Sequence, residues 1–123
     1  MDGLRRLQLA HQIVRKLMDL ISQIRKYEAE KEKLRRKLTF EENTRLIREL
    51  NELIERLEQE RTSLERELAA QLKEFNEWAS EVGLRIEHFN IARIEYREYI
   101  LGELLADLDL AVLFTARFMQ ERE

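Results

Sequence analysis

The stretch ILGELLADLDLAVLFTARFM, residues 100–119, is an apolar block in a chain of 123 residues of which 38% are charged. As a helix it is long enough to cross a bilayer, but it contains the acidic residues Glu103, Asp107 and Asp109. Each acid at the centre of a spanning helix costs roughly 2.5–3.5 kcal/mol, so the three together oppose insertion. The stretch therefore predicts a helix buried against protein, and we expect no membrane span.

On a helical wheel this block is apolar on nearly every side. The main apolar group lies within about 40° of one direction and consists of Leu101, Leu105, Leu108, Val112 and Met119. Leu110 and Phe114 lie on the opposite, charged strip, and Phe118 lies on a flank. A helix that is apolar nearly all round is buried nearly all round, and two helices of one chain cover only part of it. We therefore expect another protein chain to cover Leu110, Phe114 and Phe118.

The overall composition is typical of long helices or coiled coils. The sequence has no proline, no cysteine and only three glycines, and proline and glycine are the residues that most often mark loops. A chain without cysteine has no disulfide and no thiolate ligand or nucleophile, which fits a reducing compartment. The first residues lack the layout of a signal peptide. We expect a single α-helical domain over residues 1–123, located in the cytoplasm.

An apolar series with alternating steps of three and four residues predicts the first helix, over about residues 3–37. The series consists of Leu7, Ala10, Val14, Leu17, Ile21 and Ile24. Asp2 is a suitable N-cap, because its carboxylate can accept a hydrogen bond from a free N–H of the first turn. Leu9, Ile13 and Leu20 widen the apolar face beyond one seam. These three residues are therefore predicted to contact a partner chain as well.

A second apolar series predicts a helix over about residues 40–82. It consists of Ile47, Leu50, Ile54, Leu57, Leu64, Leu68, Leu72, Phe75, Ala79 and Val82. Extended towards each other in steps of seven, the two series differ in register by two residues, whereas coiled coils absorb slips of three or four. Thr39 and Glu42 also have the spacing of a capping box. These features favour a turn near residues 38–40, and one continuous helix over residues 3–82 stays open as the alternative.

Gly83 predicts the end of the second helix, because glycine just past a helix end adopts the left-handed conformation without steric cost. Asn90 is a suitable N-cap for a third helix, and Phe89 and Ile94 are placed as a hydrophobic staple. We expect this third helix within residues 86–122. The predicted fold is all-α, either an elongated three-helix bundle or a long antiparallel helical hairpin with coiled-coil character.

Charge is distributed unevenly, with a net charge of +6 in residues 1–38, −6 in residues 39–82 and −3 in residues 83–123. A first helix folded onto the second would bring opposite charges together, although each exposed pair contributes only a few tenths of a kcal/mol. The basic segment also predicts an alternative function, which is nucleic-acid binding through phosphate contacts. Its candidate residues are Arg25, Lys26, Lys33, Arg35, Arg36 and Lys37. Interleaved glutamates favour a solvated, internally paired helix face instead.

No residue pattern in the sequence predicts catalysis, a metal site or a cofactor. A di-metal helical bundle uses Glu-x-x-His pairs, but Gln8 and Arg85 stand three positions before the two histidines, His11 and His88. Two neighbouring acids of the apolar block, Asp107 and Asp109, point about 200° apart on a helix and cannot act on one bond together. The sequence therefore predicts a non-enzymatic structural or interaction protein that forms a homo-oligomer or acts as an adaptor subunit in a larger assembly.

Overall fold

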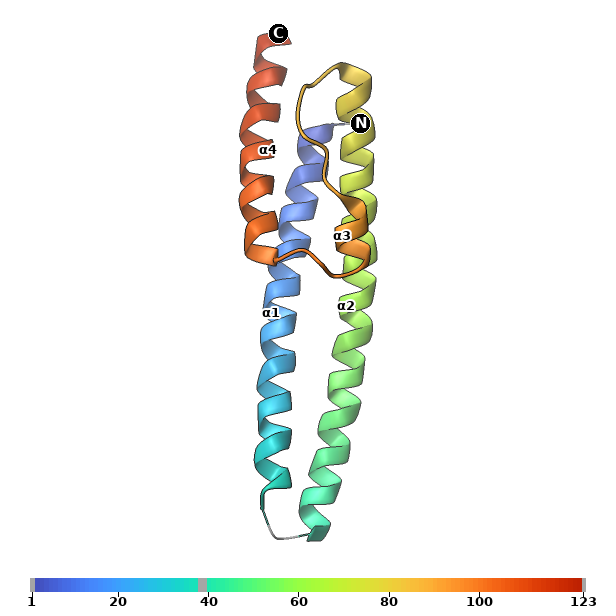
Figure 1. Cartoon of the computed structure of the whole chain (residues 1–123), viewed down its shortest axis with the longest axis vertical. Coiled ribbons are helices and arrows are strands. Elements are labelled where there is room, and N and C mark those ends of the chain that lie inside the picture. Colours follow the sequence, from blue (N-terminus) through green and yellow to red (C-terminus); the bar gives the residue numbers. More distant parts are fainter. Residues whose placement is uncertain (1, 38–39, 123) are drawn as a thin grey trace.

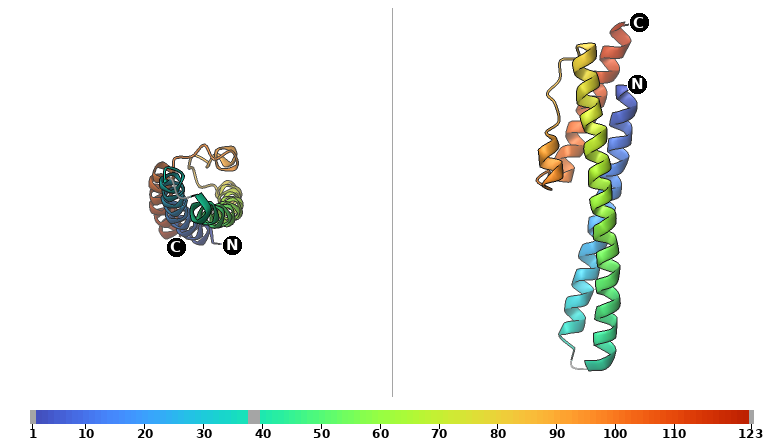
Figure 2. Two further views of the ribbon diagram at one scale, coloured as in Figure 1. Left: turned by 90° about the horizontal axis from the view of Figure 1, so that it is seen from below. Right: turned by 90° about the vertical axis from the view of Figure 1, so that its right-hand side faces the viewer.

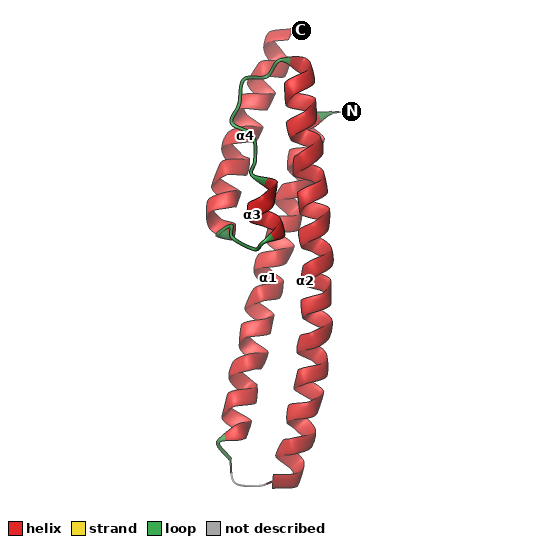
Figure 3. Ribbon diagram, turned by 45° about the vertical axis from the view of Figure 1, so that its right-hand side comes forward, coloured by secondary structure: helices red, strands yellow, loops and turns green. Residues whose placement is uncertain are grey.

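The computed structural model describes residues 2–37 and 40–122 and is helical over most of them, with no strand in these ranges (Figures 1 and 3). The helices in chain order are α1 (Gly3–Arg35), α2 (Phe40–Val82), α3 (Ile91–Glu95) and α4 (Leu101–Arg122). Among the described helices none is both long and apolar enough to cross a membrane.

The chain reverses direction between α1 and α2, which pack side by side along most of their length (Figure 1). The continuous helix is therefore wrong, whereas Thr39, one half of the predicted capping box, lies outside the described residues. Asn43 on α2 is buried, and its amide donates hydrogen bonds to the carbonyl oxygens of Leu34 at 3.2 Å and of Lys37 at 3.5 Å. Leu34 lies in the last turn of α1, where its carbonyl also accepts from the N–H of Lys37 at 3.2 Å, and Lys37 follows the helix. Asn43 therefore joins the two helices at the turn.

The outer ends of α1 and α2 confirm two predicted caps. The carboxylate of Asp2 accepts a hydrogen bond from the backbone N–H of Leu4 at 3.0 Å. Gly83 has a φ of 77°, and the N–H of Leu84 donates to the carbonyl of Ala79 at 2.9 Å, which is the bond of a Schellman motif. The two helices therefore begin and end where local sequence signals place them.

The predicted third helix over residues 86–122 is wrong, because the structure divides it into an extended segment, α3 and α4. Residues 84–90 run beside α2 without helical structure, as the right-hand view of Figure 2 shows. Asn76 of α2 fixes this segment, since its side chain accepts from the N–H of Phe89 at 3.0 Å and donates to the carbonyl of Phe89 at 2.9 Å. Asn90 is the N-cap residue of α3, as predicted, although its side chain makes no capping hydrogen bond.

A second interruption separates α3 from α4 at residues 96–100, where the sequence contains neither glycine nor proline. Arg97 has a φ of 60°, in the left-handed region that side chains other than glycine rarely adopt. Its guanidinium lies 3.1 Å from the carboxylate of Glu65 and 3.7 Å from that of Glu58, and it donates to the hydroxyl of Thr62 at 2.9 Å. All three partners belong to α2, so contacts with a distant part of the chain hold the break open.

The main hydrophobic core lies at the end of the molecule where α4 packs against α1. Leu7, Leu17, Leu72, Phe75 and Leu104 are among its fully buried side chains. The other end consists of α1 and α2 alone (Figure 1), and its separate cluster of buried side chains contains Leu20, Ile24 and Ile54.

Candidate protein-binding surface on α4

Helix α4 has one buried side and one exposed apolar side. Its buried side packs on α1 and consists of Leu104, Leu108, Ala111 and Thr115. On the remaining surface, Leu110 is 53% exposed, Leu113 is 57% exposed and Phe114 is 48% exposed. These large side chains stay accessible because α4 covers one side of α1 and is not enclosed between two helices.

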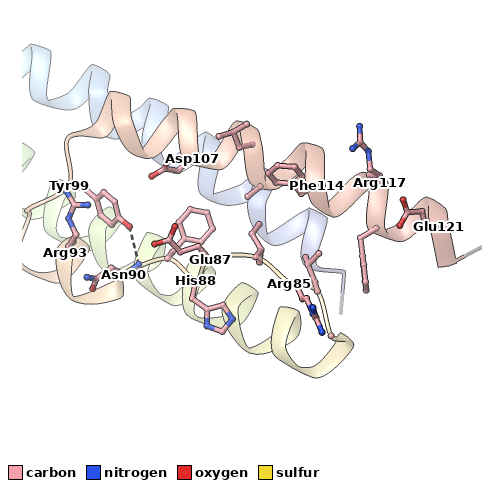
Figure 4. A pocket seen from close by; sticks show the side chains of 17 residues that line it. Arg85, Glu87, His88, Asn90, Arg93, Tyr99, Asp107, Phe114, Arg117 and Glu121 are labelled. Atoms are coloured by element: carbon pink, nitrogen blue, oxygen red, sulfur yellow. Dashed lines mark hydrogen bonds between the residues drawn. The ribbon is translucent and has the colours of Figure 1, made fainter.

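A groove of about 770 Å³ runs between α4 and the extended segment after α2 (Figure 4). Leu110, Phe114 and Phe118 of α4 line it on one side. The opposite wall consists of the consecutive residues 83–90, in which Phe89 is buried against the ring of Phe75 with centroids 5.8 Å apart. The groove therefore combines an apolar helix face with a wall that α2 holds in place.

The lining of this groove is polar and apolar in about equal parts. Asp107, Arg117 and Glu121 come from α4, whereas Arg85 and Glu87 come from the extended wall. Both signs are present on both walls, so the groove has no single sign of charge that would select a strongly charged small ligand. A surface that is about half apolar and carries charges of both signs has the composition of an ordinary protein–protein interface.

Hydrogen bonds and ring contacts fix both ends of the groove. At one end the guanidinium of Arg122 donates to the carbonyl of Val82 at 2.9 Å. At the other end the N–H of Asn90 donates to the hydroxyl of Tyr99 at 3.2 Å, and the guanidinium of Arg93 stacks 4.3 Å from the centre of the Tyr99 ring (Figure 4). Two of these contacts use arginines, whose planar side chains stack well on aromatic rings and donate in fixed directions.

The structure separates the predicted interface residues into two groups. Leu110, Phe114 and Phe118 lie together along the groove. Ile13 is only 4% exposed and belongs to the main core, and Leu20 is 6% exposed and packs with the buried residues of the two-helix end. Leu9 is half-buried. Because α2 covers a wider side of α1 than a single seam requires, Ile13 and Leu20 offer little surface to a partner.

Leu113 is an exposed residue that the helical wheel did not identify, because the wheel places it on a flank of the main apolar group. The true inner direction of α4 is centred on Leu104 and Thr115, and Leu113 lies about 180° from Leu104 on a helix. The four buried positions Leu104, Leu108, Ala111 and Thr115 are spaced four, three and four residues apart. Had this series been taken as the inner face, Leu113 would have been placed on the exposed side.

The predicted nucleic-acid candidates are all exposed. Lys33, Arg35, Arg36 and Lys37 lie at or just past the end of α1, whereas Arg25 lines a pocket together with Leu101 at the start of α4. Arg35 pairs with Glu32 of its own helix at 3.0 Å. Ion pairs within one helix also occur between Lys31 and Glu28 and between Arg45 and Glu49. The predicted attraction between the basic and the acidic helix is seen at the other end of α1, where Arg6 lies 3.0 Å from Glu74 of α2.

The two histidines lie far apart in the fold and have separate partners. The imidazole of His11 lies 3.1 Å from the carboxylate of Asp109, and this contact joins α1 to α4. The imidazole of His88 lies 3.3 Å from the hydroxyl of Ser80. In residues 2–37 and 40–122 no group of three or more His, Cys, Asp or Glu side chains is placed to hold a metal ion.

Comparisons with protein-family models, with curated proteins and with solved structures give no significant match. Its function is therefore inferred from the geometry of this chain alone.

Proposed function

We propose that this protein is a non-enzymatic structural or interaction protein, and that α4 binds another protein chain through Leu110, Leu113 and Phe114. In this proposal the long α1–α2 pair is a coiled-coil hairpin, and α4 completes an elongated three-helix bundle at one end. The chain then works as a scaffold that holds an apolar surface at one end of a long helical body.

The observation that carries the proposal is the exposure of these three large apolar side chains on one helix, beside a groove that Leu110 and Phe114 line. Single exposed apolar residues are normal, but a continuous apolar patch with a polar edge typically marks an interaction site. A partner that covers the patch gains roughly 25 cal/mol for each Å² of apolar surface removed from water. Phenylalanine in such a position is also enriched in the buried centre of interfaces.

The experiment compares the wild type with the double variant Leu110→Glu and Phe114→Glu. Light scattering measures the mass of the purified chain, and co-purification records the chains that bind to it. We expect the variant to lose at least about tenfold in association, because central interface residues commonly contribute more than 1 kcal/mol each.

A matched control is Leu46→Glu, which introduces the same charge at another exposed leucine, on α2 (42% exposed). This variant should associate like the wild type, and circular dichroism should show the same helix content in all three proteins. The proposal is wrong if the double variant retains every association of the wild type.

A specific observation also supports the alternative function, nucleic-acid binding. Arg25, Lys26, Lys33, Arg36 and Lys37 are exposed and make no ion pair with any other residue in the described part of the chain. Unpaired cations along one helix are available for contacts with phosphate groups.

The corresponding experiment titrates fluorescent duplex DNA and single-stranded RNA at low and at moderate salt. Replacing Lys26, Lys33 and Arg36 with glutamine should weaken binding and reduce the slope of its salt dependence by about 3. The matched control neutralises three cations of α2, namely Arg45, Arg48 and Arg56. Absence of binding at low salt would exclude this function.

A further inference from the structure

We propose that the chain covering the exposed side of α4 is α4 of a second copy, packed antiparallel about a two-fold axis at the level of Val112. This inference rests on the proposed function and specifies its partner. It follows from the order of apolar and charged residues along the exposed strip of the helix that borders the groove.

The exposed strip of α4 that borders the groove is a heptad seam separate from the buried one. It consists of Glu103, Asp107, Leu110, Phe114, Arg117 and Glu121, with steps of four, three, four, three and four residues. The structure leaves Leu110 and Phe114 about half exposed at its centre and leaves Asp107 and Arg117 exposed on either side of them. This spacing is the pattern with which one helix packs along another.

Antiparallel packing of two such seams matches every central position with a complementary one. Leu110 and Phe114 are equally distant from Val112 along the sequence, so Leu110 of one copy lies opposite Phe114 of the other. Asp107 and Arg117 are also equally distant from Val112, so each carboxylate lies opposite a guanidinium. Because the axis is two-fold, both pairs form twice, once on each side of the axis.

The charges also distinguish this arrangement from a parallel one. In a parallel pair, Asp107 would lie opposite Asp107 and Arg117 opposite Arg117, which places like charges together. Neither side chain has an ion-pair partner elsewhere in residues 2–37 and 40–122, so both are free to make the contact between copies. Complementary charge therefore selects the antiparallel orientation and a second copy of this chain.

The outermost pair of the seam joins two acids, Glu103 and Glu121. Glu103 lies 3.9 Å from the guanidinium of Arg93, which reduces its charge towards a partner. Both acids lie at the ends of the seam, where solvent screens like charges most strongly. The central apolar and oppositely charged positions therefore outweigh this unfavourable pair.

The groove beside α4 is compatible with the same symmetry. Leu110 and Phe114 line the groove, and its other wall is the extended segment of residues 83–90 (Figure 4). In the proposed dimer, α4 of one copy lies in the groove of the other copy. It is placed between residues 83–90 and α4 of that other copy, and the reverse holds for the second α4. The same surface is used twice, which closes the assembly at two chains. Leu113 lies on the far side of α4 from its buried face and stays exposed in this dimer.

The experiment reverses the two charges separately and together in the full chain. Sedimentation equilibrium at concentrations up to about 1 mM, where pairs with a millimolar Kd are still detected, should give the wild type a mass approaching twice 14.9 kDa. Asp107→Arg alone and Arg117→Asp alone each create two like-charge pairs, so each should raise the Kd of the dimer by about tenfold or more. The double variant recreates both pairs in reversed order and should return the Kd to within about threefold of the wild type.

A matched control is Glu67→Arg, which makes the same charge change at an exposed position of α2 and should leave the Kd unchanged. Circular dichroism of each variant establishes that the fold is intact. If the single variants weaken the dimer and the double variant does not recover it, the antiparallel arrangement is wrong. If the antiparallel arrangement is wrong but Leu110→Glu with Phe114→Glu still weakens association, the proposed function of α4 in protein binding is retained and only the antiparallel pairing is rejected. A wild type that stays at 14.9 kDa throughout excludes a second copy as the partner, and co-purification then tests the proposed function separately.

Discussion

The two ends of the molecule use the same pair of helices in different ways. At the end that contains α4, the buried side chains of α1, α2 and α4 form one core together with Phe89 and Ile94. At the other end α1 and α2 have only each other (Figure 2), and among the described residues the buried cluster there consists of Leu20, Ile24 and Ile54. The end with a third element therefore buries more apolar side chains, and the apolar series of α1 itself ends at Ile24.

The side of α1 that bears His11 shows the same contrast within one helix. His11 contacts Asp109 of α4, whereas Lys33 and Arg36 lie on the same side near the turn and are exposed. Their positions differ from that of His11 by no more than about 40° on a helical wheel. The side of α1 that contacts α4 at His11 is therefore open to solvent near the turn.

The largest difference between the two ends should appear when a buried side chain is truncated. Phe75 is fully buried and contacts the rings of Trp78 and Phe89, so Phe75→Ala should lower the free energy of unfolding by about 3–5 kcal/mol. Ile54→Ala, at the two-helix end, should cost only about 2 kcal/mol, the lower part of the range for such a change. Urea denaturation measures both. A loss for Ile54→Ala as large as that for Phe75→Ala would contradict weaker packing at the two-helix end, because isoleucine loses fewer buried atoms.

A smaller effect is expected where α1 begins beside the end of α2. A methyl group added to Gly3 would collide with the ring of Trp78, so Gly3→Ala should destabilise the protein by about 1–3 kcal/mol. Gly102 in α4 has open space around the same position. Gly102→Ala should therefore stabilise the protein by about 0.5–1 kcal/mol. Thermal unfolding of both variants tests the pair, and a loss of stability in Gly102→Ala would contradict the expected sign.

The smallest effect concerns the turn at the two-helix end. Asn43→Ala removes the hydrogen bonds to the carbonyls of Leu34 and Lys37 and should cost about 1 kcal/mol. Hydrogen exchange should become faster in the last turn of α1. Asn51→Ala makes the same chemical change at an exposed position of α2 and serves as the control. Unchanged exchange at the end of α1 would show that Asn43 does not hold the turn.

Sequence reasoning succeeded where structure depends on neighbouring residues and failed where it depends on distant ones. The N-cap Asp2 and the glycine ending at Gly83 act within one helical turn, and both are present. The break before α4 has no local signal, because its residues are compatible with a helix and its stability comes from Glu58 and Glu65 of α2 through Arg97.

The candidate surface shows the same limit. Leu110 and Phe114 could be identified because their wheel positions share a strip with charged residues, and both are exposed. The width of the apolar face of α1 predicts that Ile13 and Leu20 contact a partner chain. The sequence does not reveal how much of that face α2 covers. The groove wall at residues 84–90 could not be predicted either, because Asn76 fixes it through side-chain hydrogen bonds to Phe89.

The carboxamide of Asn76 has a consequence for how an all-helical chain can display an extended segment. It offers Phe89 one acceptor and one donor, which are the two groups that a neighbouring β-strand residue would offer through its peptide units. A single side chain thus replaces one rung of a sheet. Together with the hydrogen bond from Leu84 to Ala79, it attaches both ends of the groove wall to α2. The helix therefore restricts the motion of this extended segment. A substitution in α2 would change the shape of the groove without altering any residue that lines it.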